Sequence, residues 1–129
     1  MSIFTKIISG EIPSYKVAED KDFIAFLDIN PNAKGHTLVV PKIEENKLFD
    51  LDKSAYNDLM QFSYRVAKAL EKSIDCKRIG MSVIGLEVPH VHVHLIPINK
   101  MADMQFTEKI TLGNEEFKIL AENISGNFI

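Results

Sequence analysis

Hydrophobic and polar positions follow two different periods along this chain, and each period indicates its own kind of element. A period of two is typical of strands, and it predicts them over residues 15–19, 22–29, 36–41, 79–84 and 88–98. A helical period predicts a short helix that ends at Gly10, a long helix over 52–74 and a short helix over 114–123. The chain therefore combines several strands with few helices.

The connections between these predicted elements favour antiparallel pairing. Asp20-Lys21 joins the first two strands and Gly85-Leu86-Glu87 joins the last two, and both connections are short enough for hairpins. The strand over 22–29 is apolar on both faces up to Asp28, so we expect it to be covered on both sides. We predict an α+β fold with a mainly antiparallel meander sheet, one long helix and short terminal helices.

Length and composition limit the classes of protein to which the chain can belong. Its 129 residues, 46% of them hydrophobic, predict a single domain over 1–129. A net charge of −3 argues against binding long nucleic acid through a basic face, but a small nucleotide remains possible. The single cysteine, Cys76, allows no internal disulfide and fits a reducing cytoplasm. We expect no signal peptide and no membrane span, because Lys6 interrupts the first apolar run.

The stretch 90–97 contains three of the four histidines, at every second position. As a strand it would direct Val91 and Val93 to the core and His90, His92 and His94 to the opposite face. Twice the strand rise of roughly 3.3 Å would separate neighbouring imidazoles by about 6.6 Å. One zinc ion, with bonds of about 2.0–2.1 Å to nitrogen, could not easily collect all three.

Three interpretations of this histidine row are open. The first is a structural role. Each buried imidazole must find hydrogen-bond partners for two ring nitrogens, so burying three such rings in the core costs free energy. The second is a metal site, although no cysteine, carboxylate or fourth histidine lies nearby in sequence as an obvious further ligand. The third is a reaction centre, and we favour it.

A neutral imidazole is a nucleophile near pH 7 when one ring nitrogen is free and the other donates its proton to a fixed acceptor. His92 has a histidine on each side, so it is the candidate to attack phosphorus. His90 and His94, or His36 at the edge of the turn-rich loop 30–35, would donate to the phosphate oxygens as imidazolium groups. The chain has neither a P-loop nor an acidic cluster for Mg²⁺, so we predict a reaction without a metal or other cofactor.

The alternation of histidine with apolar residues over 90–96 resembles the signature of the histidine triad (HIT) superfamily. Four further segments resemble its Hint-like branch in the same order, so the resemblance covers residues 2 to about 98. These segments are Ile3-Phe4-Thr5-Lys6-Ile7-Ile8, Gly10-Glu11-Ile12-Pro13, Phe26-Leu27-Asp28-Ile29-Asn30-Pro31 and Gly35-His36-Thr37-Leu38-Val39-Val40-Pro41-Lys42.

The resemblance implies a homodimer whose sheet continues across both subunits. It also implies a phosphoramidase-like enzyme that hydrolyses purine nucleotide conjugates at the α-phosphate through a transient nucleotidyl group on His92. His94 and His90 would support that phosphate, His36 matches an additional upstream histidine of the family, and Asp28 matches the carboxylate that binds the ribose hydroxyls. The matching base pocket is apolar and consists of Ile3, Phe4, Ile7, Ile12, Phe26, Ile29 and Leu38.

The chain departs from the family pattern at three places. Ser2 and Thr5 stand where many bacterial relatives have cysteines of a zinc site, so we predict no structural zinc. The loop before the triad is short, and the carboxylate of Glu87 would repel phosphate unless it is turned away. The last thirty residues match nothing. The alternatives to the hydrolase are therefore a nucleotide-binding module with weak or no catalysis and a metal-dependent enzyme.

Overall fold

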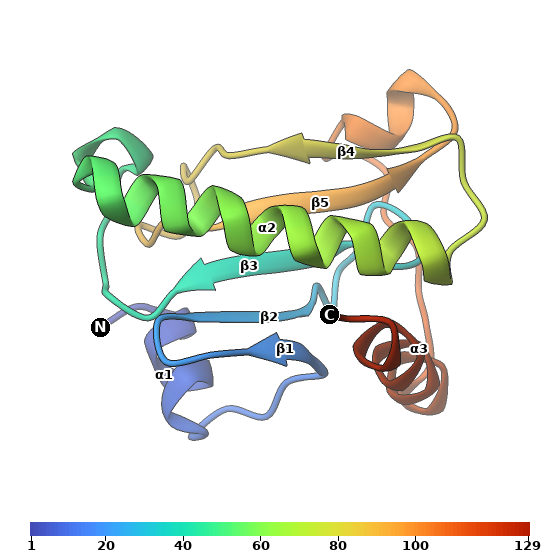
Figure 1. The fold of residues 1–129 in the computed structure, drawn as a ribbon. Coiled ribbons are helices and arrows are strands. Elements are labelled where there is room, and N and C mark those ends of the chain that lie inside the picture. The colour runs from blue at the N-terminus through green and yellow to red at the C-terminus, as the bar shows by residue number, and fades with distance from the viewer.

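The computed structural model describes all 129 residues and contains one antiparallel sheet of five strands in the order β1-β2-β3-β5-β4 (Figure 1). The strands are β1 (Lys16–Glu19), β2 (Phe23–Leu27), β3 (Thr37–Pro41), β4 (Arg78–Ser82) and β5 (Val93–Ile98). Every strand pair in the sheet is antiparallel. The predicted α+β class and the antiparallel pairing of both strand pairs are confirmed, but the connection between β4 and β5 is longer than predicted and spans residues 83–92.

Three α-helices accompany the sheet, as the helical periods predicted. They are α1 (Ile3–Ser9), α2 (Lys53–Ser73) and α3 (Asn114–Gly126), and short 3₁₀ turns occupy Leu48–Asp50 and Met101–Met104. Ser2 caps α1 through its side chain, and Gly10 ends that helix in the left-handed region at φ 86°. Asp52 caps α2 by accepting from the backbone of Ala55. Gly113 occupies the N-cap position of α3, and Asn114 is the first residue of that helix.

The main core lies between one face of the sheet and the helices α2 and α3. The apolar residues on the buried face of α2 are Leu59, Phe62, Val66, Ala69 and Leu70. Val91, Val93 and Leu95 belong to the same cluster and are at most 1% exposed, so the apolar residues between the histidines build the core as predicted. Each fully buried aliphatic side chain contributes about 1.5–3 kcal/mol by leaving water.

A second, smaller core lies on the other face of the sheet, where α1 packs. Phe4 of α1 contacts a cluster formed by Ile24 and Phe26 of β2 with Leu38 and Val40 of β3. The rings of Phe4 and Phe26 lie 5.8 Å apart between centroids. All five residues of β2 are buried, so this strand is covered on both sides, as its apolar pattern predicted.

The predicted strand over 88–98 is wrong in its first half, because β5 begins only at Val93. Pro89 has no N–H to donate to a strand ladder. The backbone N–H of His90 instead donates to Val88, and that of Val91 donates to Glu45 in the loop that follows β3. His90 and His92 therefore lie in an irregular segment, so the imidazoles do not form the evenly spaced row expected of a strand.

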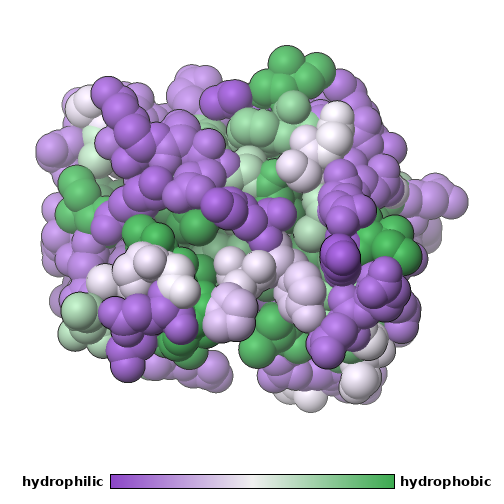
Figure 2. Space-filling view, turned by 90° about the horizontal axis from the view of Figure 1, so that it is seen from below, coloured by the Kyte–Doolittle hydropathy of each residue, from purple (hydrophilic) through white to green (hydrophobic).

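None of the helices combines the length and the apolar composition that crossing a bilayer requires. On the face shown in Figure 2, hydrophobic groups occupy several separate places among mostly hydrophilic side chains.

Candidate active site

A cavity of about 680 Å³ opens on the face of the sheet where α1 packs. It brings together all eight residues that the sequence assigned to nucleotide binding. These are Ile3, Phe4, Ile7, Ile12, Phe26, Asp28, Ile29 and Leu38. His92 and His94 line the same cavity, whereas His36 and His90 lie behind its wall. One pocket therefore combines an apolar half with a half that carries a carboxylate and imidazoles.

The strand register explains why these residues meet. Phe26 of β2 pairs with Leu38 of β3, and Leu38 pairs with His94 of β5. Residues directly opposite one another in antiparallel strands project to the same face. The sheet thus places two apolar side chains and one histidine in a row across the floor of the cavity.

The hydrogen bonds of His92 leave one ring nitrogen available for chemistry. Its Nδ1 lies 2.8 Å from the carbonyl oxygen of His90. A carbonyl oxygen only accepts, so Nδ1 carries the proton and the neutral ring keeps a lone pair on Nε2. Burial lowers the pKa of His92, which keeps the ring neutral at pH 7. The Phe4 ring packs against it at 4.8 Å between centroids.

A chain of hydrogen bonds also fixes the tautomer of His94. The backbone N–H of Asn32 donates to Nδ1 of His36 at 3.0 Å, so His36 carries its proton on Nε2. That Nε2 lies 3.0 Å from Nδ1 of His94 and donates to it. His94 must then carry its own proton on Nε2. Its N–H is available to donate to an anionic oxygen in the cavity.

The neutral state of these two rings corrects the sequence interpretation, which used imidazolium donors. Burial, reinforced by neighbouring positive charge, lowers the pKa of His36 to about 3 and that of His94 to about 4. Both rings are uncharged at pH 7. The site therefore offers a fixed N–H dipole from His94, and the histidines bring no net positive charge of their own.

His90 does not occupy the place that the sequence interpretation gave it. Its Nε2 lies 2.8 Å from the carbonyl oxygen of Pro41, and its Nδ1 lies 2.6 Å from Oγ of Ser2. The ring is fully buried, and both nitrogens are engaged. Direct donation from His90 to a phosphate does not fit this geometry. Its contribution to the site is the backbone carbonyl that orients His92.

Asp28 directly follows β2 and lines the cavity. The backbone N–H of Asn30 donates to its Oδ1, and its Oδ2 lies 3.6 Å from Nε2 of His36. Burial raises the pKa of this carboxyl group, while the Asn30 bond opposes the shift. A carboxylate at the edge of an apolar pocket suits the hydroxyl groups of a sugar, which donate hydrogen bonds to it.

Asp28, His36 and His94 offer potential metal ligand atoms that all lie within 4.8 Å of one another. Two of these atoms, Nε2 of His36 and Nδ1 of His94, already share a hydrogen bond. A metal ion there would have to displace that bond and with it the tautomer that directs N–H of His94 into the cavity.

Sequence reasoning missed the contribution of the chain beyond residue 98. Phe106 and Lys109 line the cavity, and the Phe106 ring packs on His94 at 4.8 Å between centroids. It also missed Asn32, which is 6% exposed and bonds to His36, Asp103 and Lys109. The position of Asn32 in the turn cluster before His36 was a usable signal. Nothing in the local pattern marked Phe106 or Lys109.

Comparison with known proteins settles the family. The model of the HIT domain matches residues 9–101. The chain belongs to the HIT domain family. A HIT-like protein of Borreliella burgdorferi is 38% identical over 97% of this chain and 96% of its own length. The adenosine 5'-monophosphoramidase of Saccharomyces cerevisiae is 44% identical over 74% of this chain and 61% of its own length, and that of Schizosaccharomyces pombe is 35% identical over 95% of both.

Solved structures of HIT proteins share the fold. A HIT-like protein of Bartonella henselae superposes with a TM-score of 0.87 at 34% identity and covers 98% of this chain and 96% of its own. A histidine triad nucleotide-binding protein of Sulfolobus tokodaii superposes with a TM-score of 0.84 at 26% identity, over 96% and 89% of the two chains. This HIT protein thus has a counterpart for nearly its whole length, including the C-terminal segment that the sequence resemblance left unmatched.

Proposed function

We propose that this HIT protein hydrolyses purine nucleotide conjugates, such as nucleoside phosphoramidates, at the α-phosphate, with His92 as the nucleophile. One observation carries the proposal. The bond from Nδ1 of His92 to the His90 carbonyl oxygen, 2.8 Å long, leaves Nε2 as a free lone pair on a residue that lines a cavity of nucleotide size.

The reaction then has two displacements at phosphorus. Nε2 of His92 forms a bond to phosphorus while the bond to the leaving group breaks. A leaving amine takes up a proton from solvent, and the attacking water returns one proton to solvent in the second step. Water next attacks the same phosphorus, the bond to His92 breaks, and the nucleotide leaves. The net reaction consumes one water, and His92 returns to its starting state. The N–H of His94 donates to the charge that develops on the phosphate oxygens.

The cavity supports this orientation of a nucleotide. The apolar side chains of Phe4, Phe26 and Leu38 suit a flat base, and the carboxylate of Asp28 suits the ribose hydroxyls. The family relationship supports the same reaction, because two of the relatives carry the name adenosine 5'-monophosphoramidase.

Rapid mixing with an adenosine phosphoramidate tests the proposal. An acid-sensitive adenylyl adduct on the protein, detected by mass within the first turnover, is the expected result. Binding of the nucleotide with neither an adduct nor product would instead support the second candidate, a nucleotide-binding module.

One observation favours that second candidate. Leu86 and Glu87 line the cavity, and the charge of Glu87 acts on both Asp28 and His92. A carboxylate close to the nucleophile opposes the approach of an anionic phosphate. If Glu87 keeps this position when a nucleotide is bound, binding will be retained better than turnover.

The homodimer belongs to the same proposal. β4 pairs only with β5, so its other edge has free backbone groups that another strand could pair with. Met81 of β4 is 47% exposed. In the loop that follows, Ile84 is 51% exposed and Leu86 is 90% exposed. A second copy pairing along β4 would cover this edge and continue the sheet. Sedimentation at micromolar concentration should give twice the mass of the chain, and a monomer would remove this part of the proposal.

A further inference from the structure

The cavity has one cationic side chain, and it comes from the part of the chain beyond the histidine triad. Lys109 is the only lysine or arginine among the lining residues, which also include the carboxylates of Asp28 and Glu87. Burial lowers the pKa of both histidines that face the cavity, which favours their neutral forms at pH 7. Among the lysines and arginines of the chain, Lys109 alone is placed to bring a full positive charge to a phosphate bound in this cavity.

The segment that carries Lys109 is fixed to the loop before β3 at several points. The side chain of Asn32 donates to the carbonyl oxygen of Asp103 at 3.1 Å, and the backbone of Ile110 donates to that of Pro31 at 3.0 Å. Between these two anchors, the Phe106 ring packs edge-on against His94. The stretch from Phe106 to Lys109 is thus held against the His36–His94 pair.

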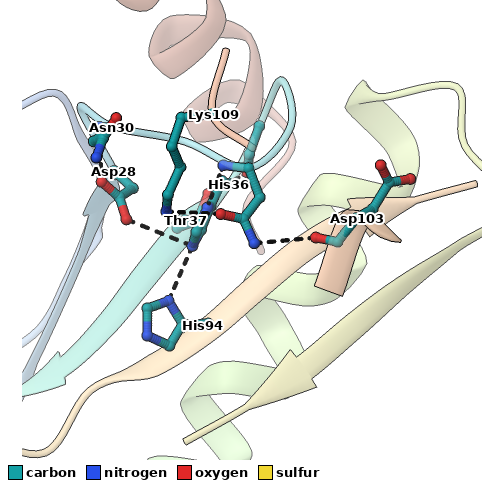
Figure 3. A network of polar contacts seen from close by, with 9 residues as sticks. Asp28, Asn30, His36, Thr37, His94, Asp103 and Lys109 are labelled. Atoms are coloured by element: carbon teal, nitrogen blue, oxygen red, sulfur yellow. Dashed lines mark hydrogen bonds and ion pairs between the residues drawn. The ribbon is translucent and has the colours of Figure 1, made fainter. Parts of the chain in front are cut away.

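The ammonium group itself is also oriented. Its Nζ donates to Oδ1 of Asn32 at 2.8 Å and lies 5.0 Å from the centroid of the Phe106 ring. Figure 3 shows the Lys109 side chain running from the C-terminal segment toward His36, with Asp28 and His94 nearby. None of the ion pairs in the structure involves Lys109. Of its three N–H groups, one is used by Asn32 and two are left for a ligand.

From this geometry we propose that Lys109 is a binding residue for the phosphate of the nucleotide, oriented by Asn32 and directed into the cavity beside His94. This inference rests on the proposed nucleotide site. It adds that the chain's own C-terminal segment supplies the charge that distinguishes a nucleotide from a nucleoside. A hydrogen bond to a charged group adds roughly 10- to 100-fold in affinity when it is buried. Lys109 is solvent-exposed, so we expect a smaller effect of about three- to fivefold.

The affinities for adenosine 5'-monophosphate and adenosine, measured by calorimetry on the full chain, test this inference. Lys109→Met should weaken binding of the monophosphate about three- to fivefold and leave binding of adenosine unchanged. Lys109→Arg should retain most of the preference for the monophosphate. Lys118→Met, which removes an exposed lysine on α3 outside the cavity, is the matched control and should behave as the wild type.

Two outcomes would overturn the inference and leave the proposed function standing. In one, Lys109→Met weakens the binding of monophosphate and nucleoside equally, which would mean that Lys109 only fastens the C-terminal segment. In the other, the variant binds both as tightly as the wild type. If the wild-type protein bound neither compound, the nucleotide site itself would be refuted, and this inference with it.

Discussion

The hydroxyl group of Ser2 ties the N-terminus to the histidine cluster, and its removal should cost stability in two ways. It caps α1 by accepting from the backbone N–H of Thr5 at 3.1 Å. It also donates to Nδ1 of His90 at 2.6 Å, because the other ring nitrogen of His90 already donates to Pro41. Loss of a cap costs about 1 kcal/mol, and a buried acceptor left unpaired costs about 1–3 kcal/mol.

Ser2→Ala should therefore lower the free energy of unfolding by about 2–4 kcal/mol, a fall on the order of 10 °C in the melting temperature. Chemical unfolding at pH 7 measures this directly. Ser9→Ala is the matched control, because Ser9 lies on the same helix and its hydroxyl bonds only to local backbone groups at the exposed surface. It should change stability by less than about 0.5 kcal/mol. If Ser2→Ala cost no more than Ser9→Ala, the tautomer assigned to His90 would be wrong, and with it the link from Ser2 to the His90 carbonyl.

Three further predictions concern the pH dependence of stability, the charge of Glu87 and the need for a metal ion. His36 and His94 have folded pKa values of about 3 and about 4, below the ordinary 6.5, so the unfolded chain takes up protons first as the pH falls. The free energy of unfolding should be highest above pH 6.5. It should fall toward pH 4 by up to about 1.4 kcal/mol per pH unit for each ring. Urea unfolding of His94→Gln should show a shallower pH dependence. Glu87→Ser should raise kcat/KM roughly 2- to 5-fold in steady-state assays by removing one exposed like charge, and an unchanged value would show that the carboxylate turns away from the phosphate. Hydrolysis should survive dialysis against a strong chelator, whereas loss of activity that zinc alone restores would contradict the assignment of His92 as the nucleophile.

The sequence alone predicted the strands and helices whose hydrophobic pattern is set by burial. The alternation around Val91, Val93 and Leu95 and the helical stripe of α2 both reflect one apolar face packed against the core. The two-sided apolar pattern of β2 likewise corresponds to the two cores on opposite faces of the sheet. In these elements the period of the hydrophobic residues and the geometry of the backbone agree.

The histidine row is where that reasoning failed, and the reason is local competition for hydrogen bonds. The alternating pattern over 88–92 fits a strand, but Pro89 cannot join a ladder, and Ser2 and Pro41 fix the side chain of His90 at a site apart from the cavity. These partners are 88 and 49 residues away along the chain. No local periodicity contains that information. The sequence alone was enough to name His92 as the candidate nucleophile, whereas the neutral state of its neighbours required their burial to be known.

Lys109 illustrates a second limit. Its segment has no strong periodicity, and only the bonds from Asn32 to Asp103 and from Ile110 to Pro31 place it beside His94. A lysine in an irregular segment is ordinarily solvated surface. The three-dimensional contacts distinguish it from the other lysines of the chain, because it alone of them lines the cavity.

The covalent state of His92 tests the central claim most directly. Each variant is mixed rapidly with an adenosine phosphoramidate, quenched and digested, and the peptide that contains residues 90–97 is weighed. Wild-type protein should carry an adenylyl group on His92, and His92→Ala should carry none while still binding adenosine 5'-monophosphate. His94→Ala should form the same adduct more slowly, by about 10²–10³, since it loses one donor to the phosphate and keeps the bond-forming nitrogen. An adduct that persists in His92→Ala, or one that maps to His94 or His36, would contradict the account.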